Sequence, residues 1–455
     1  RFSPSVPPTL PLSMDPPPPS ASPAKDESAP PPLEKGSLPA PPLLHAIPPS
    51  SSSGEREFED GRTLGSSECL GGGAVNFMSR PRLRTAAYMA DGKPENVKGH
   101  FRMLIKRCLT KKHAKNGHYY PFTSLEVRGV IKYAKAILSA EPPLIEMKVP
   151  CVVIGDLHGQ FVDLNRIFEM FAKDERPGYV TTRYVFLGDY VDRGRQSLEI
   201  VMVLFMLKVL YPKQFALLRG NHECRAINKA YGFYAEIKER FLDPRNALDI
   251  FDQFNDLFTH LPYACLVANN ILCMHGGISS KMKSRDDLKQ LPKPLKDVAS
   301  NQLATDLLWA DPMEGLPGEV PNKVRGVSVY FGEATLDQCL ADLKIGMIIR
   351  GHQMMMNGFN FFHNKLITVF SAAAYYPDKP NRGAVCIVDS SGRVGFKVIV
   401  PFKNDHPEAK PKLFRGDHDG SNDFDTGYVK VAPGVVKKPQ EESSGEKEEK
   451  PKGPQ

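Results

Sequence analysis

The segment from residue 151 to residue 401 contains eight short apolar runs rich in valine and isoleucine, and each run ends in a glycine or a polar turn. Runs of this length and composition are typical of strands that are buried on both faces. The runs are CVVIG (151–155), YVFLG (184–188), FALLRG (215–220), NILCMHGG (270–277), GMIIRG (346–351), LITVFS (366–371), AVCIVD (384–389) and FKVIVP (396–401).

Longer segments with helical periodicity lie before and between these runs. Apolar residues recur at steps of three and four from Asn96 to about Ala140, and Ser197 to Leu210 is apolar nearly all round, which predicts a deeply buried helix. Further helical patterns cover 231–241, 247–259 and 336–343. Because strands and helices alternate, the sequence predicts an α/β domain, with two sheets packed face to face.

The two ends of the chain differ in composition from its middle. Seventeen of the 41 prolines fall within the first 50 residues, and residues 437–455 are nearly all Lys, Glu, Pro, Gly and Ser. Such segments cannot bury enough apolar surface to offset the entropy of ordering them. We therefore predict a disordered N-terminal extension (1–92), one folded domain that carries the chemistry (93–403) and a disordered charged tail (404–455).

Charge, hydropathy and cysteine usage exclude several functions. The net charge of +7 is modest for 455 residues, and its local clusters, such as the arginines at 80–84, fit a solvated tail better than a nucleic-acid contact. No apolar run approaches the roughly 18 residues of a membrane span. The eight cysteines form no CxxC pair, and several lie inside apolar runs, which indicates buried free thiols in a reducing compartment, the cytoplasm or the nucleus.

Polar side chains follow five of the predicted strands at the point where each strand ends. Because the carboxyl ends of strands in α/β folds converge on one crevice, we expect these side chains to meet, although they span nearly 200 residues. The residues are Asp156, His158, Asp189, Asp192, Asn221, His222, His275 and His352.

Six of these residues have the chemistry of metal ligands: two carboxylates, an amide oxygen and three imidazoles. Six ligands are too many for one tetrahedral ion with an open position, but they suit two divalent ions that share a bridging carboxylate. A single histidine at a strand end is usually structural. Six such residues at the same topological position favour a metal site.

Arginines beside these residues indicate the substrate. Guanidinium groups match phosphate oxygens, so Arg193 and Arg325 are candidate phosphate ligands, whereas Arg219 and Arg350 fit a phosphate contact and a structural salt bridge equally well. Two cations with arginines favour a phosphoester, which a water activated between the metals would attack. The leaving alkoxide needs a proton, and His222, oriented by Asp192, is the candidate general acid.

The chain contains, in order, the strings GDLHGQ (155–160), GDYVDRG (188–194), LRGNHE (218–223) and HGG (275–277), followed by RGVSVYFG (325–332) and RGHQ (350–353). This set resembles the signatures of the PPP-family protein serine/threonine phosphatases. The resemblance covers roughly residues 95–402 and is strongest to the type-1 catalytic subunit. It implies a calcineurin-like metallophosphoesterase fold, a two-sheet β-sandwich flanked by helices. It also implies hydrolysis of phosphoserine and phosphothreonine by a hydroxide that bridges two metal ions.

The resemblance also implies roles for individual residues. Asp156, His158 and Asp189 would hold the first ion, and Asp189, Asn221, His275 and His352 the second, with Mn, Fe or Zn as the metal. His222 is implied as the general acid with Asp192 behind it. Arg193 and Arg325 would clamp the phosphate with Asn221. Tyr234 and Tyr375 match positions that border the substrate cleft.

The chain departs from the family around this cleft. Where the family usually reads SAPNYCGEFDNAG, the chain reads SAAAYYPDKPNRG (371–383), so Tyr375 is kept but Tyr376 replaces a reactive cysteine. Acidic residues of the type-1 pattern are missing at 354–357 and around 320–324, although Asp311 remains. We therefore expect a weakened preference for basic residues near the phosphosite.

The resemblance suggests partners besides phosphoprotein substrates. Phe361 and Phe396 match two residues of a hydrophobic groove that binds regulatory subunits in the type-1 subfamily, although both also fit an ordinary core. Two alternatives to an active protein phosphatase are a catalytically weak scaffold and a phosphoesterase that acts on nucleotides or diesters. The complete set of candidate ligands argues against the first, and the LRGNHE and RGVS strings argue against the second.

Overall fold

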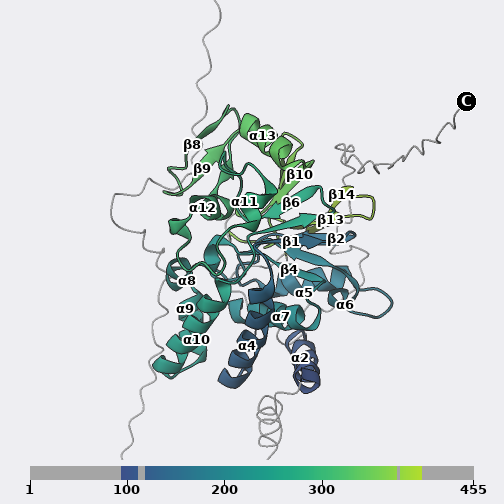
Figure 1. Ribbon diagram of the computed structural model, residues 1–455. Helices are drawn as coiled ribbons and strands as arrows, with labels where there is room; N and C mark the ends of the chain where they lie inside the picture. Colours follow the sequence, from purple (N-terminus) through teal and green to yellow (C-terminus); the bar gives the residue numbers. More distant parts are fainter. Residues whose placement is uncertain (1–93, 111–117, 377–379, 402–455) are drawn as a thin grey trace, which may run out of the picture. The chain divides into compact units, whose positions relative to one another are not determined.

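The computed structural model describes residues 94–110, 118–376 and 380–401, so the predicted extensions 1–92 and 404–455 lie outside the described residues. Within the described part, two mixed β-sheets pack face to face, and helices cover the outer face of each (Figure 1). The α/β fold predicted from the sequence, two sheets flanked by helices, is confirmed. Among the described residues, no helix is long and apolar enough to cross a membrane.

The five-stranded sheet has the order β14-β13-β2-β3-β4, in which β2, β3 and β4 are parallel and β13 is antiparallel to both of its neighbours. Its strands are β2 (Cys151–Ile154), β3 (Tyr184–Phe186), β4 (Phe215–Leu217), β13 (Gly383–Val388) and β14 (Val394–Ile399).

The six-stranded sheet has the order β1-β5-β6-β10-β12-β11, in which β6, β10 and β12 are parallel. Its strands are β1 (Leu144–Met147), β5 (Ala264–Val267), β6 (Ile271–Met274), β10 (Met347–Arg350), β11 (Phe359–Phe362) and β12 (Leu366–Val369). A smaller sheet has the order β7-β9-β8 and consists of β7 (Asp311–Pro312), β8 (Glu319–Pro321) and β9 (Val329–Phe331).

Helices on the five-stranded side surround α7, which packs against α2, α4 and α9. This group and its neighbours are α2 (Pro94–Cys108), α4 (Ser124–Ala140), α5 (Phe161–Met170), α6 (Gly178–Thr181), α7 (Ser197–Leu210), α8 (Arg225–Ala230), α9 (Phe233–Arg240) and α10 (Pro244–Phe258). The six-stranded side carries α11 (Arg285–Lys289), α12 (Gln302–Trp309) and α13 (Glu333–Leu343). Two 3₁₀ turns cover Asn221–Glu223 and Val298–Ser300.

Alternation along the central strands builds separate layers of core. In β2, Val153 points into the layer between the two sheets, whereas Val152 and Ile154 face the helices around α7. Both faces are therefore apolar, which is why this strand reads as an uninterrupted hydrophobic run. The α7 helix is buried from Ser197 to Val209, as its all-round apolar sequence predicted.

The eight predicted strands are all present, but six further strands were not predicted. Three of the six, β7, β8 and β9, have only two or three residues, too few to show an apolar pattern. β11 lies at the sheet edge with only Phe362 buried, and no strand was predicted there. The helical patterns match α2, α4, α7, α9, α10 and α13, with ends that differ by a few residues.

A backbone contact joins the two sheets just past β2. Asp156 forms a parallel bridge with Phe370 at the end of β12, which joins the carboxyl edges of the two sheets. A β-carbon on Gly155 would lie 2.0 Å from the carbonyl oxygen of Val369, so only glycine fits at this position. This junction brings the polar ends of β2, β3 and β4 together with those of β6 and β10.

Candidate metal centre

The six candidate metal ligands predicted from the sequence are buried and lie together where the carboxyl ends of these strands meet. Each of them lies within four residues of the end of a strand, and parallel pairing places those strand ends at one edge of each sheet. The residues are Asp156, His158, Asp189, Asn221, His275 and His352.

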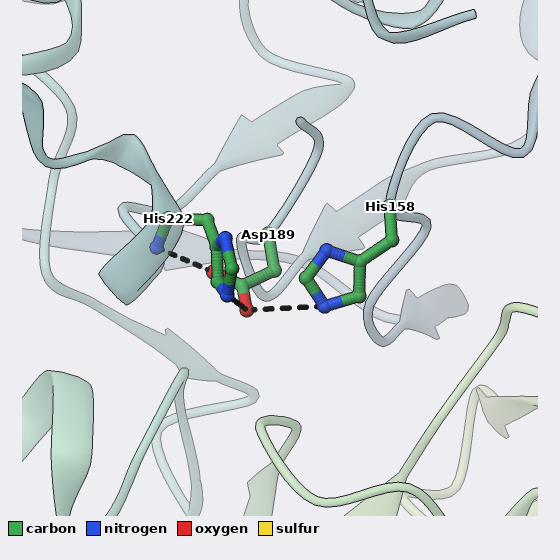
Figure 2. A group of neighbouring side chains, drawn as sticks. All are labelled: His158, Asp189 and His222. Atoms are coloured by element: carbon green, nitrogen blue, oxygen red, sulfur yellow. Dashed lines mark hydrogen bonds and ion pairs between the residues drawn. The ribbon is translucent and has the colours of Figure 1, made fainter. Parts of the chain in front are cut away.

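The first group of possible metal ligands is His158, Asp189 and His222. Figure 2 shows the Asp189 carboxylate between the two imidazole rings. Oδ2 of Asp189 lies 3.5 Å from Nε2 of His158 and 4.0 Å from Nε2 of His222. Oδ2 of Asp156 lies 3.7 Å from the same nitrogen of His158, which adds a second carboxylate to this side of the site.

The second group is Asp189, His275 and His352, and Asn221 completes it. Oδ2 of Asp189 lies 3.3 Å from Nε2 of His275. Oδ1 of Asn221 lies 2.8 Å from that nitrogen and 3.0 Å from Nδ1 of His352. Asp189 belongs to both groups, as a bridging carboxylate must.

The contacts within these groups fit divalent cations better than they fit a hydrogen-bonded network. Nε2 of His275 and Nδ1 of His352 lie 3.2 Å apart, and both also face Oδ1 of Asn221. One proton on either nitrogen cannot satisfy both of the remaining lone pairs, so one acceptor is left without a donor. Burial lowers the pKa of His158 to about 3, and burial together with Arg325 lowers that of His352 well below its ordinary value. Neutral imidazoles present the lone pairs that metal ions bind. The two buried His/Asp groups are therefore consistent with a dimetal site.

His222 forms a short contact on the side away from Asp189. Its Nδ1 lies 2.6 Å from Oδ2 of Asp192, and Oδ1 of Asp192 accepts the backbone N–H of Phe233, which fixes the carboxylate. Burial disfavours the charged imidazole, but the carboxylates of Asp189 and Asp192 outweigh it and raise the pKa of His222. The pair can therefore hold a proton at the edge of the site.

Five residues of the site have a left-handed backbone, which costs a side-chain-bearing residue roughly 1–3 kcal/mol. Such strain persists only where the surroundings enforce it, and it is concentrated at functional sites. The residues are His158 (φ 43°), Asp189 (φ 54°), Asp192 (φ 76°), Arg193 (φ 66°) and His352 (φ 69°).

The four arginines separate into two kinds. Arg219 and Arg350 are fully buried and donate to backbone carbonyls, and Arg350 also donates to Asp311 at 2.9 Å, so both are structural. Arg325 is half-buried, and its Nη2 donates to the carbonyl of His352 at 3.4 Å. Arg193 is exposed, and its guanidinium lies 4.5 Å from the ring centre of Tyr231.

The predicted cleft tyrosines lie in different surroundings. The ring of Tyr375 lies 5.3 Å from that of His158, beside the first group. The ring of Tyr234 instead packs on Phe251 at 4.6 Å, so the structure does not bring it to the other site residues. Tyr231, which was not singled out from the sequence, lies 5.5 Å from the ring of His222. The two tyrosines are three residues apart: Tyr231 lies between α8 and α9, whereas Tyr234 lies in the first turn of α9.

Glu223 is another residue that sequence reasoning missed, although it stands inside the LRGNHE string. Its buried carboxylate accepts the backbone N–H groups of Asp189, Tyr190 and Gly220 at 2.8, 2.9 and 3.0 Å. A β-carbon on Gly220 would lie 2.3 Å from both Asp189 N and Asp189 Oδ1, so the loop that carries Gly220 packs against Asp189 with no room for a side chain. Glu223 thus fastens the loop that carries Asp189 to the loop that carries Asn221.

These features define a metal-dependent phosphoesterase, and the matches to a family model and to one solved structure at 33% identity support this class. A model of the calcineurin-like phosphoesterase family matches residues 149–356. The chain is 33% identical to a protein serine/threonine phosphatase from Saccharomyces cerevisiae with similarity to human phosphatase PP5, over 65% of this chain and 94% of that one, with a TM-score of 0.57. A cold-active protein-tyrosine phosphatase of a Shewanella species is 20% identical, over 57% and 81% of the two chains, with a TM-score of 0.43. The chain belongs to the calcineurin-like phosphoesterase family.

Proposed function

We propose that this protein is a serine/threonine protein phosphatase that hydrolyses phosphoserine and phosphothreonine in other proteins. The observation that carries the proposal is the His222–Asp192 pair, joined at 2.6 Å, in which the His222 ring also faces Asp189, the residue shared by the two buried His/Asp groups. A proton donor next to a dimetal site suits a phosphomonoester whose leaving group is a serine or threonine alkoxide. The 33% sequence identity with a yeast protein serine/threonine phosphatase supports the same substrate class.

The metal ligands divide into two sets in this proposal. Asp156, His158 and Asp189 would hold one ion, and Asp189, Asn221, His275 and His352 would hold the other, with Mn, Fe or Zn matching these donors. When bound, two divalent ions polarise the phosphoryl oxygens and lower the pKa of a water molecule.

His222 donates the proton that the departing alkoxide needs. Nδ1 of its ring is held by Asp192, so Nε2 is left on the side of Asp189, where the substrate binds. The carboxylate of Asp192 keeps the ring in one orientation and stabilises its protonated form.

Arg193 and Arg325 bind the phosphoryl oxygens that are not engaged elsewhere. Nε of Arg325 is held by Asp311 at 3.0 Å, which fixes the guanidinium beside His352 with N–H groups to spare. The face of Arg193 rests on Tyr231, which limits its freedom without using its donors. Tyr375 and Tyr234 are the predicted borders of the cleft, and only the first contacts a candidate ligand ring.

The proposal is tested by phosphate release from a phosphoserine peptide and from a dinucleotide, with Mn²⁺ present. We expect hydrolysis of the peptide, and we expect Asp189→Asn to abolish it. Asp174→Asn is the matched control, because Asp174 also has a left-handed backbone (φ 50°) but lies on the surface. Full activity of Asp189→Asn, or hydrolysis of the dinucleotide alone, contradicts the proposal.

Regulatory subunits are a further part of the proposal, together with the type-1 resemblance from which it comes. The buried Phe396 stacks on Phe359 with ring centres 3.8 Å apart, and the half-buried Phe361 meets it edge-on at 5.7 Å. Binding of an RVxF-type peptide should be lost in Phe361→Ala but kept in Phe171→Ala, another half-buried phenylalanine. If the unchanged protein does not bind the peptide, this part is wrong.

A further inference from the structure

Exposed apolar side chains are concentrated on the small β7-β9-β8 sheet and in the loops that follow β10 and β12. Among the described residues, nine large hydrophobic side chains are exposed; four of them lie on the small sheet or its connections, and two lie in those loops. An apolar cluster beside polar and charged groups is typical of a binding surface rather than of random exposure. The six residues are Met313, Val320, Val324, Val327, Met356 and Tyr376.

Strand register connects this surface with the site. Asp311, Tyr330 and Val320 are cross-strand partners in β7, β9 and β8, so their side chains lie in one row on the same face. Asp311 is the carboxylate that holds Arg325. The row therefore leads from the metal centre outward and ends at Val320, whose side chain is 39% exposed.

The turn between β8 and β9 holds its valines outward. Buried Asn322 donates to Asp311 at 3.1 Å and accepts the N–H of Arg325 at 3.0 Å, and its backbone pairs with Ser328 and Gly326. This hydrogen-bond network fixes the conformation of the turn and orients the Arg325 side chain toward His352. Val324 and Val327, on either side of that arginine, are left 55% and 38% exposed. We call Val320, Val324 and Val327 the apolar rim.

The charged groups near the apolar rim complement an apolar or acidic segment rather than a basic one. Lys323 in the same turn and Arg193 across the site are exposed. The one acidic residue from 319 to 331 is Glu319, and it already accepts hydrogen bonds from the backbone and hydroxyl of Ser280. A basic substrate segment would therefore meet cations and no free carboxylate on this hairpin.

We infer that the apolar rim binds hydrophobic side chains that flank the phosphorylated residue of the substrate and so selects phosphoproteins by apolar sequence around the phosphosite. The inference rests on the proposed function, because it supplies the substrate class for that same site. Val324 and Val327 lie one and two residues from Arg325, and an extended peptide advances about 3.3–3.6 Å per residue. The substrate positions two and three residues from the phosphoserine, about 7–11 Å away in an extended chain, are therefore the positions to vary in a test.

Three phosphoserine peptides test the inference, identical except for Leu, Gly or Lys at the positions two and three residues from the phosphoserine. With Mn²⁺ present, we expect kcat/KM for the Leu peptide to exceed that for the Gly peptide by roughly 5- to 20-fold, with the Lys peptide lowest. The double variant Val324→Ser/Val327→Ser should reduce the Leu-to-Gly ratio to below about 2-fold. The ratio cancels any general loss of activity.

Leu242→Ser is the matched control, because Leu242 is 88% exposed and lies between α9 and α10, outside the apolar rim. It should leave the ratio unchanged. Equal rates for all three peptides overturn the inference but leave the phosphatase proposal intact, and so does a ratio that survives in the double variant. Hydrolysis of a dinucleotide without hydrolysis of any phosphopeptide instead overturns the proposed function itself.

Discussion

Removing the Glu223 side chain should strongly destabilise the protein. The Glu223 carboxylate is fully buried, and its two oxygens accept three backbone N–H groups, two at Oε2 and one at Oε1. In Glu223→Ala these three donors lose their partner in the interior. Each buried donor left unpaired costs about 1–3 kcal/mol, so the three together cost roughly 3–9 kcal/mol.

We expect the lower part of this range for Glu223→Ala, about 3–5 kcal/mol, because water can enter the space left by the side chain. Glu223→Gln should cost less, about 2–3 kcal/mol. Its amide oxygen can replace Oε2 and keep the bonds to Asp189 and Gly220, but its NH₂ group then faces the N–H of Tyr190. Since domains are stable by only about 5–15 kcal/mol, both losses are large.

Urea unfolding in the presence of a chelator measures these losses, because the chelator removes the stabilisation that bound metal adds. Glu146→Ala is the control: Glu146 is exposed on β1, so its change should stay within about 0.5 kcal/mol. A loss below 1 kcal/mol in Glu223→Ala would refute the reasoning. An equal loss in Glu223→Gln and Glu223→Ala would show that the individual hydrogen bonds do not set the cost.

Three further predictions concern the proton donor, the core and a surface turn. His222→Asn should lower kcat on a phosphoserine peptide by about 10²–10⁴-fold but lower it less on p-nitrophenyl phosphate, whose leaving group needs no proton; equal losses would argue against a general acid. Phe251→Ala should lower the free energy of unfolding in urea by about 3–5 kcal/mol, because this buried ring packs against Phe233 and Tyr234. A loss near 1 kcal/mol would contradict this, because it would mean that neighbouring side chains fill the space left by the ring. Desolvation opposes ionisation of Asp389, but hydrogen bonds from Ser391 and Arg393 outweigh it and lower its pKa from 3.8 to about 2. The carboxylate therefore stabilises the fold above pH 3.8 and loses this effect as the pH falls toward 2, so the stability gap between Asp389→Asn and the unchanged protein should shrink from pH 6 to pH 3; a constant gap contradicts it.

Much of the candidate site could be predicted from the sequence, because its residues stand at positions that the fold repeats. A strand buried on both faces must be apolar throughout, so polar residues can appear only where it ends. Asp156, Asp189 and Asn221 follow β2, β3 and β4 in this way, and parallel pairing brings those ends to one edge. The metal-ligand chemistry was therefore readable before any contact was known.

Several contacts could not be read from the sequence, because they depend on register between segments far apart in the chain. From the sequence, Arg219 and Arg350 could equally be phosphate ligands or structural groups. Their burial and their hydrogen bonds to backbone carbonyls show that they are structural. The same holds for Glu223, whose three donors come from two different loops. The sequence gives the type of each hydrogen-bond donor or acceptor, but not the group with which it pairs.

The sequence by itself determined the α/β fold, eight of the strands of the two larger sheets and the set of donors at their ends. It did so because burial of both faces imposes a local pattern that needs no partner to be visible. Only the tertiary structure decided which of Tyr231 and Tyr234 faces His222, and that a sheet of two- and three-residue strands carries Asp311 to Arg325. Strands of two or three residues are stabilised by contacts with neighbouring segments rather than by their own composition, so their positions cannot be predicted from their sequence.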